Sequence, residues 1–218
     1  MPHDATTELA GETVTLLPER ALYWPRRATL FVADLHWGKA AAWRAAGVPL
    51  PGGSTSADLD RLSGCIERSG ARRLALLGDL IHARAGRAEA TLAAISAWRE
   101  RHAALQLLLV RGNHDQHAGD PPAAWNIETV DAPYLEAPFV LRHHPEPSTE
   151  GYTLAGHLHP AVAMNGSGRQ RLRLPCFWFG ATVGVLPAFG GLTGSAVVAP
   201  AAGDNVFVIA DDQVLRVQ

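Results

Sequence analysis

Short apolar runs dominate the first half of the chain and have the length of buried strands. They occupy residues 13–17, 21–24, 30–33, 74–77 and 105–110. Two segments between these runs repeat apolar residues at helical spacing. One follows the Pro- and Gly-rich stretch 49–53, with N-cap residues at 54–56, and the other spans 87–102. The pattern predicts an α/β fold in which strands alternate with helices.

After about residue 121 the pattern changes to strands separated by glycine and proline. The stretches "APFVL", "GYTLA", "RLRLPCFWF", "SAVV", "NVFVIA" and "QVLRV" each predict a strand. No flexible linker and no internal repeat divides the two halves of the sequence. We therefore expect one domain over residues 1–218.

Five of the predicted strands end at residues of metal-ligand type. These endings are Asp34-Leu35-His36, Gly78-Asp79, Gly112-Asn113-His114-Asp115, His143-His144 and Gly156-His157-Leu158-His159. In open α/β sheets, the carboxyl ends of strands bring residues that are distant in sequence into one site. Each motif alone is too common to be diagnostic. Five of them in one order, each after an apolar run, predict a metal site.

The order of these motifs resembles the calcineurin-like metallophosphoesterase superfamily. The stretches "LYWPRRATLFVADLHWGKAAAWRAAGVPLPGG", "LGDLIHAR" and "LPAFGGLTG" resemble its bacterial subgroup of ligase-associated DNA-damage-response endonucleases. The resemblance implies a four-layer α/β/β/α sandwich, with two mixed sheets flanked by helices, and two divalent metal ions. Manganese is the metal implied by the subgroup, whereas carboxylate, imidazole and amide ligands also allow iron, zinc or cobalt.

The resemblance also assigns roles to the motif residues. One ion would be bound by Asp34, His36, Asp79 and His159, and the other by Asp79, Asn113, His143 and His157, so that Asp79 bridges them. A hydroxide between two ions about 3.5–4 Å apart would attack the phosphodiester in line. His114 would protonate the leaving group, and Asp115 would orient its imidazole and favour the charged form.

Two histidines beside the motifs leave alternatives open. His82 stands where the superfamily often has a second Asp, and it either supports the site or substrate or is a polar residue satisfied nearby. Strand alternation lets only one of His143 and His144 face the metals easily, and the resemblance favours His143.

The cations near the motifs also have two interpretations. Lys39 and Arg111 either contact substrate phosphates or are solvated structural cations. Arg169, Arg171 and Arg173 alternate along a predicted strand and either bind phosphates or line a solvated face.

The composition leads us to expect a cytoplasmic soluble protein. The 218 residues are 47% hydrophobic and 18% charged, which is enough for a full core, and the formal charge of −2 gives no support for nonspecific nucleic-acid binding. Cys65 and Cys176 are too few and too far apart for a disulfide framework. The sequence begins without a basic and apolar leader, and no apolar run approaches the length of about 20 residues that spans a membrane.

We expect a metal-dependent phosphodiesterase, and the subgroup resemblance favours a DNA endonuclease that acts in repair beside DNA ligase and helicase partners. A small-molecule phosphoesterase acting on nucleotides or cyclic nucleotides would share every catalytic residue and differ only in its substrate groove. A non-catalytic metal-binding scaffold for repair partners is a third hypothesis. The intact Asn113-His114-Asp115 stretch argues against it, because a scaffold needs no general acid.

Overall fold

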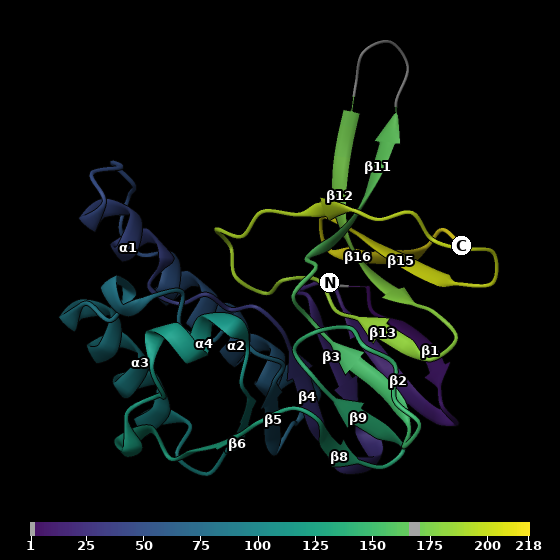
Figure 1. Cartoon of the computed structure of the whole chain (residues 1–218), viewed down its shortest axis with the longest axis horizontal. Helices are drawn as coiled ribbons and strands as arrows, with labels where there is room; N and C mark the ends of the chain where they lie inside the picture. The colour runs from purple at the N-terminus through teal and green to yellow at the C-terminus, as the bar shows by residue number, and fades with distance from the viewer. Residues whose placement is uncertain (1–2, 166–170) are drawn as a thin grey trace.

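The computed structural model of the protein describes residues 3–165 and 171–218. Arg169, a member of the predicted basic stretch, lies outside the described residues, and so does the side chain of Arg171. Two β-sheets and a layer of helices make up the described chain (Figure 1).

The first sheet has seven strands that lie side by side in chain order. The strands are β1 (Ala5–Leu9), β2 (Glu12–Leu17), β3 (Ala21–Trp24), β4 (Thr29–Val32), β5 (Arg73–Leu76), β6 (Gln106–Val110) and β7 (Ile127–Val130). From β1 to β4 the neighbours are antiparallel, and from β4 to β7 they are parallel. Parallel neighbours need a crossover connection, and helices supply it after β4, β5 and β6.

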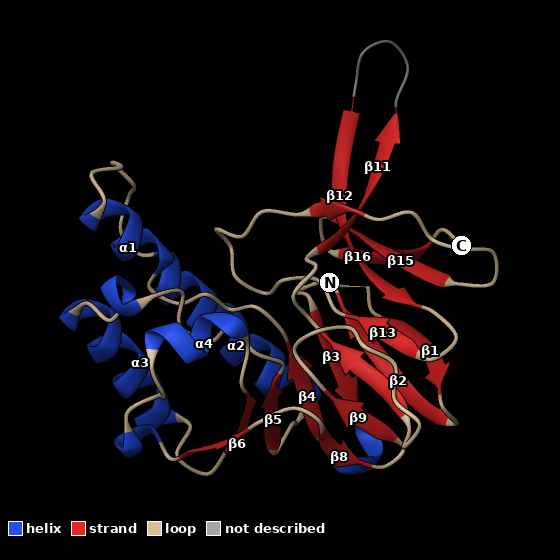
Figure 2. Cartoon of the chain, in the orientation of Figure 1, coloured by secondary structure: helices blue, strands red, loops and turns tan. Residues whose placement is uncertain are grey.

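The helices cover one face of this sheet, as the separation of helices and strands in Figure 2 shows. They are α1 (Lys39–Ala45), α2 (Ser54–Ser69), α3 (Glu89–Arg101) and α4 (Asn113–Ala118), with short 3₁₀ turns η1 (Pro25–Arg27), η2 (Arg84–Gly86) and η3 (Ala123–Trp125). The apolar stripes of α2 and α3 pack on β4, β5 and β6 through buried residues such as Leu62, Ile95 and Trp98. Periodicity in the sequence predicted both helices.

The second sheet has nine strands and takes up the rest of the chain. They are β8 (Tyr134–Glu136), β9 (Phe139–Leu141), β10 (Tyr152–Ala155), β11 (Pro160–Asn165), β12 (Arg171–Phe179), β13 (Val183–Val185), β14 (Ala196–Val197), β15 (Asn205–Ala210) and β16 (Gln213–Arg216). β10 lies between β9 and β13 and is parallel to both, and most other neighbours are antiparallel.

An apolar core joins the two sheets face to face. The ring of Phe139 on β9 packs edge-on against Trp24 on β3, with centroids 5.0 Å apart, and against Phe31 on β4, 6.3 Å away. All three side chains are fully buried. This core fixes where the carboxyl ends of the strands of one sheet lie relative to those of the other.

The predicted α/β class with two mixed sheets is confirmed, but the helices flank only one sheet. Within residues 3–165 and 171–218, no helix covers the outer face of the second sheet, because its strands are joined mostly by hairpins and short loops. A small separate apolar cluster of Cys176, Val206 and Val208 lies on β12 and β15 of this sheet. No helix of the described chain is both long and apolar enough to cross a membrane.

The predicted side-chain cap of α2 is also absent. Gly53 in the left-handed region, with φ of 91°, precedes the helix, and no side chain caps it. The Thr55 hydroxyl accepts a hydrogen bond from the Gly38 N–H instead, 3.1 Å away, which ties the start of α2 to the start of α1.

The inter-sheet core should be the most sensitive part of the fold. We predict that Phe139→Ala lowers the free energy of unfolding by about 3–5 kcal/mol, since it leaves a cavity between Trp24 and Phe31. Leu135→Ala, on the neighbouring strand but 54% exposed, should change it by less than about 0.5 kcal/mol. Urea denaturation of both variants measures the difference, and equal losses would contradict the assignment of this core.

Candidate metal centre

The seven predicted ligand residues converge where strand ends from the two sheets meet. Asp34 and His36 follow β4, Asp79 follows β5, Asn113 follows β6, His143 follows β9, and His157 and His159 follow β10. Their ligand atoms form overlapping groups, in each of which the atoms lie within 4.8 Å of one another: Asp34 with His36 and His159, Asp34 with Asp79 and His143, and His143 with His144 and His157. Asn113 adds its Oδ1, 3.0 Å from His143 Nε2.

The backbone is strained at the same positions. Asp34, His36, Asp79, His157 and His159 all have φ between 47° and 69°, in the left-handed region. For residues other than glycine this conformation costs roughly 1–2 kcal/mol each. Interlocking hydrogen bonds maintain it: the His36 N–H donates to the Asp79 carbonyl, and the Asp34 N–H donates to that of Gly78. Such strain clusters at functional sites.

Two glycines of the motifs allow the close approach of these loops. A Cβ on Gly78 would overlap the ring of His143, and a Cβ on Gly156 would lie 2.6 Å from Asp34 Oδ2. Any side chain at either position would push a ligand residue out of the group.

Asp34 and Asp79 are buried carboxylates, and no Lys or Arg among residues 3–165 and 171–218 pairs with them. One oxygen of each accepts a backbone N–H: Asp34 Oδ2 from His157, and Asp79 Oδ1 from His114, both at 2.9 Å. Asp34 Oδ1 has no hydrogen-bond partner. A buried carboxylate oxygen without a partner is costly, and a bound cation would compensate it.

The imidazoles are oriented so that their lone pairs face these carboxylates. His143 Nδ1 lies 3.0 Å from the Leu77 carbonyl and His159 Nδ1 lies 3.1 Å from the Gly194 carbonyl, and since a carbonyl only accepts, each Nδ1 carries the proton. In the neutral rings, Nε2 is then a bare acceptor. It lies 3.4 Å from Asp79 Oδ1 for His143, and 3.6 Å from Asp34 Oδ1 for His159. Acceptor atoms that converge in this way fit a metal ion, and the Nδ1 contacts fix the tautomer as in known metal sites.

Burial favours the neutral form of two imidazoles at the centre, His36 and His82. Burial first, and then nearby His114, His159, His82 and Lys39, together lower the pKa of His36 to about 2. Burial, followed by the charges of Lys39 and His114, lowers the pKa of His82 to about 4. A neutral imidazole is the form that binds metal.

Asp115 does not make the predicted contact with His114. Its carboxylate is buried and accepts three backbone N–H groups instead, from Asp79, Leu80 and Gly112, at 2.8, 2.9 and 2.8 Å. At the third position of α4 it reaches back to the helix start, as N-terminal acidic residues often do. Asp115 therefore fixes the loop of Asp79 to the start of α4.

His114 is oriented by His82. Its Nδ1 donates to the His82 carbonyl at 2.5 Å, and the two rings stack with centroids 4.9 Å apart. His114 Nε2 is left facing the centre, 3.9 Å from Asp79 Oδ2. The His82 ring also meets His36, with 3.3 Å between their Nδ1 atoms. Of the two alternatives for His82, these contacts favour support of the site.

The neighbours His143 and His144 differ in burial. His143 is buried among Asp34, Asp79 and Asn113, whereas His144 is exposed and packs its ring on that of His157, with centroids 4.1 Å apart. The geometry favours His143 as the ligand, as the sequence did.

A buried charged group that the sequence analysis missed holds the "LPAFGGLTG" stretch against the site. Asp58 on α2 accepts the Gly191 N–H at 3.1 Å, and Arg61 donates to the Phe189 carbonyl and lies over the Phe189 ring. Arg20 donates to the Ala188 carbonyl at 3.3 Å. The only signal in the sequence was a carboxylate next to the apolar stripe of α2.

The stretch "LPAFGGLTG" contacts two parts of the ligand group, at Asp34 and at His159. The N–H groups of Phe189 and Gly190 donate to the carbonyls of Ala33 and Asp34, at 2.8 and 3.1 Å, and the Gly194 carbonyl accepts from His159. Its resemblance to the repair subgroup thus has a physical explanation, because it positions Asp34 and His159 together.

The predicted substrate cations differ in availability. Arg111 binds Asp120 through two hydrogen bonds and Asp131 through a third, which raises its pKa, so its guanidinium is already engaged. Lys39 begins α1, three residues after His36, and burial lowers its pKa. Arg173 is exposed on β12.

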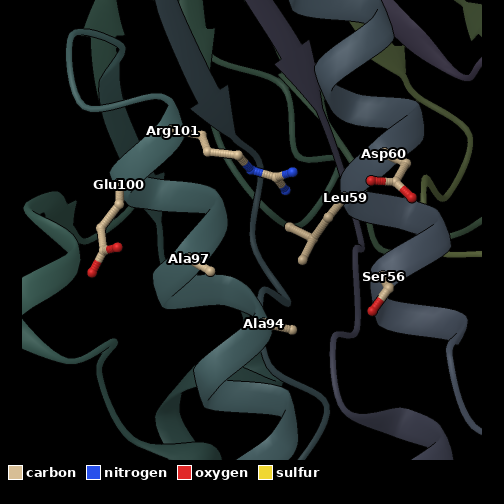
Figure 3. Close-up of a pocket in the computed structure, with 7 residues that line it drawn as sticks. All are labelled: Ser56, Leu59, Asp60, Ala94, Ala97, Glu100 and Arg101. Atoms are coloured by element: carbon tan, nitrogen blue, oxygen red, sulfur yellow. The ribbon is translucent and has the colours of Figure 1, made fainter.

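A surface pocket between α2 and α3 lies apart from this chemistry. Ser56, Leu59, Asp60, Ala94, Ala97, Glu100 and Arg101 line it (Figure 3). None of the predicted site residues belongs to it, so we place the functional site at the strand ends.

Two mixed sheets with aspartates and histidines at adjoining strand ends define the metallophosphoesterase class. The crystal structure of the nuclease MPE from Pseudomonas putida matches with a TM-score of 0.87 and 41% identity, over 99% of this chain and 100% of that one. The chain therefore belongs to the metallophosphoesterase family of nucleases that includes MPE.

The other comparisons give no further support for the family assignment. Yfce, a phosphoesterase from E. coli, matches with a TM-score of 0.35 and 18% identity over 84% of this chain and 88% of that one, which is too weak to carry an argument. No protein-family model matches the sequence. No curated protein matches it.

The role of Asp115 can be tested by its removal. We predict that Asp115→Ala lowers the free energy of unfolding by about 3 kcal/mol or more, because three buried N–H groups lose their acceptor at roughly 1–3 kcal/mol each. Asp115→Asn, which keeps one oxygen, should lose less. Urea denaturation of both variants is the measurement. Unchanged stability of Asp115→Ala together with lost turnover would instead support a direct action on His114.

Proposed function

We propose that the protein is a dinuclear metal-dependent phosphodiesterase that cuts DNA internally. The observation that carries the proposal is the position of Asp79 between two ligand groups. Its Oδ2 faces His36, 3.7 Å from Nε2, and its Oδ1 faces His143, 3.4 Å from Nε2. A carboxylate with one oxygen toward each group suits a bridge between two ions, and known two-metal sites separate the ions by about 3.5–4 Å.

In this proposal one ion is bound by Asp34, His36, Asp79 and His159, and the other by Asp79, Asn113, His143 and His157. Divalent ions supply a strong nucleophile at neutral pH and neutralise charge on the phosphate. The oxygen and nitrogen donors suit manganese, and also iron, zinc or cobalt.

His114 supplies the proton for the leaving oxygen. Its Nδ1 is fixed on the His82 carbonyl, so only Nε2 can release a proton toward the centre. Donation from Nε2 to the departing alkoxide neutralises the charge that develops there. The ring is half-buried, which leaves its edge accessible to a substrate.

The choice of DNA as substrate rests on the family membership and on the match to the nuclease MPE along the whole chain. Because ligand residues come from both sheets, we propose that residues 1–218 act as one domain. A cytoplasmic role in DNA repair, beside a ligase and a helicase, rests on the subgroup resemblance alone.

The bridging role of Asp79 predicts a loss of metal and of activity together. Wild-type protein reconstituted with Mn²⁺ should hold close to two ions per chain and nick supercoiled plasmid, and Asp79→Asn should lose most of both. Elemental analysis after desalting gives the metal content. A matched control is His114→Ala, which should keep its metal. Turnover of nucleotides without plasmid nicking would favour the small-molecule hypothesis.

The general-acid role of His114 predicts a dependence on the leaving group. His114→Ala should slow plasmid nicking by about 10²–10⁴-fold, because the alkoxide departs without a proton. On bis-p-nitrophenyl phosphate the loss should be much smaller, since p-nitrophenolate is a stable leaving group. Equal losses on both substrates would show that His114 acts in some other way.

A further inference from the structure

Trp43 is an exposed tryptophan on α1, the helix that begins three residues after His36. In the described part of the chain it is the one exposed Trp, Tyr or Phe, with 44% of its surface accessible. Trp24, Trp37, Trp98 and Trp125 are buried, and the half-buried Trp178 donates its indole N–H to Asp204. Exposed aromatic side chains near a site are frequent contacts for a binding partner.

Lys39 connects Trp43 to the metal centre. The Lys39 N–H donates to the carbonyl of His36, and its ammonium lies 5.7 Å from the centre of the Trp43 ring. The same ammonium is close enough to His36 and His82 to lower the pKa of both. Along the chain the order is therefore His36, Lys39 and Trp43, and the Lys39 ammonium lies over the indole.

A close backbone contact holds the start of α1 in place, and local hydrogen bonds close its end. Gly38, with φ of 79°, brings its backbone so close to Gly86 that a Cβ would overlap the Gly86 carbonyl. The Trp43 carbonyl accepts the N–H groups of Ala46 and Val48, at 3.1 and 2.9 Å, which closes the end of the helix. The indole is thus presented on a formed helix, so a partner that stacks on it need not order that helix first.

We propose that Trp43 stacks on a nucleobase of the substrate strand beside the scissile phosphate. The Lys39 ammonium contacts the phosphate that lies between this base and the metal centre. This proposal rests on the proposed function and names the part of the substrate that the site reads. In a nucleotide, one sugar separates the phosphate from the base. The ammonium of Lys39 would match the phosphate, and the indole of Trp43 would match the base. Stacking on an aromatic side chain tolerates every base, because every base has a π-face.

The test compares normal and abasic DNA. Trp43→Ala should raise KM for a short oligothymidylate by about 5- to 150-fold, the range that corresponds to 1–3 kcal/mol per stacked base. An oligonucleotide of equal length with abasic residues keeps the phosphates and lacks the bases, so wild type and Trp43→Ala should have similar KM values for it. Trp43→Phe should restore most of the affinity for oligothymidylate. Leu135→Ala, 54% exposed in another part of the chain, is the matched control and should behave as wild type.

A second readout needs no turnover. Oligothymidylate added in the presence of EDTA should quench the tryptophan fluorescence of the wild type, and Trp43→Phe should abolish that quenching. If Trp43→Ala cuts both oligonucleotides with wild-type KM, the stacking proposal is wrong and the proposed nuclease function still stands. If the wild type neither binds nor cuts DNA but hydrolyses bis-p-nitrophenyl phosphate, both proposals fall.

Discussion

The burial of two carboxylates side by side, which no Lys or Arg of the described residues pairs with, is the constraint on which the site depends. In each of Asp34 and Asp79, one carboxylate oxygen accepts a hydrogen bond from a backbone N–H of a loop that follows another strand. The other oxygen faces imidazoles. Buried charges of one sign are costly, and in the described part of the chain only imidazoles face these two. The site is therefore built for cations, and the two carboxylates also determine how the ligand loops meet.

This arrangement requires that both sheets be held in one relative position. Asp34 and Asp79 follow strands of the first sheet, and His143, His157 and His159 follow strands of the second. The apolar core between the sheets and the hydrogen bonds between their loops keep these strand ends in register. Five left-handed ligand residues add strain to the same place, so the loops need the many backbone hydrogen bonds that interlock them.

Residues around the ligands work mainly by positioning. Asp115 binds three N–H groups, the His82 carbonyl fixes His114, and Asp58 with Arg61 holds the stretch that supports His159. In each case a side chain or carbonyl satisfies a polar group of the backbone or a ligand ring, and thereby selects one orientation. Each of these contacts therefore supports a ligand residue or His114 from outside the ligand group.

The sequence by itself determined the α/β class, most strands, the two long helices and the set of residues that meet at the centre. Local patterns are sufficient to predict these features, because the spacing of apolar residues and the residues at which a strand ends can both be read from neighbouring positions in the sequence. The same patterns could not show that Asp115 turns to backbone N–H groups, that Arg111 is bound by Asp120 and Asp131, or that the second sheet has no helical cover. They also gave no sign that Asp58, 133 residues before Gly191, would hold it. The tertiary structure decided these features, because a side chain with several available partners is directed by whichever one the packing of distant segments brings within hydrogen-bond distance.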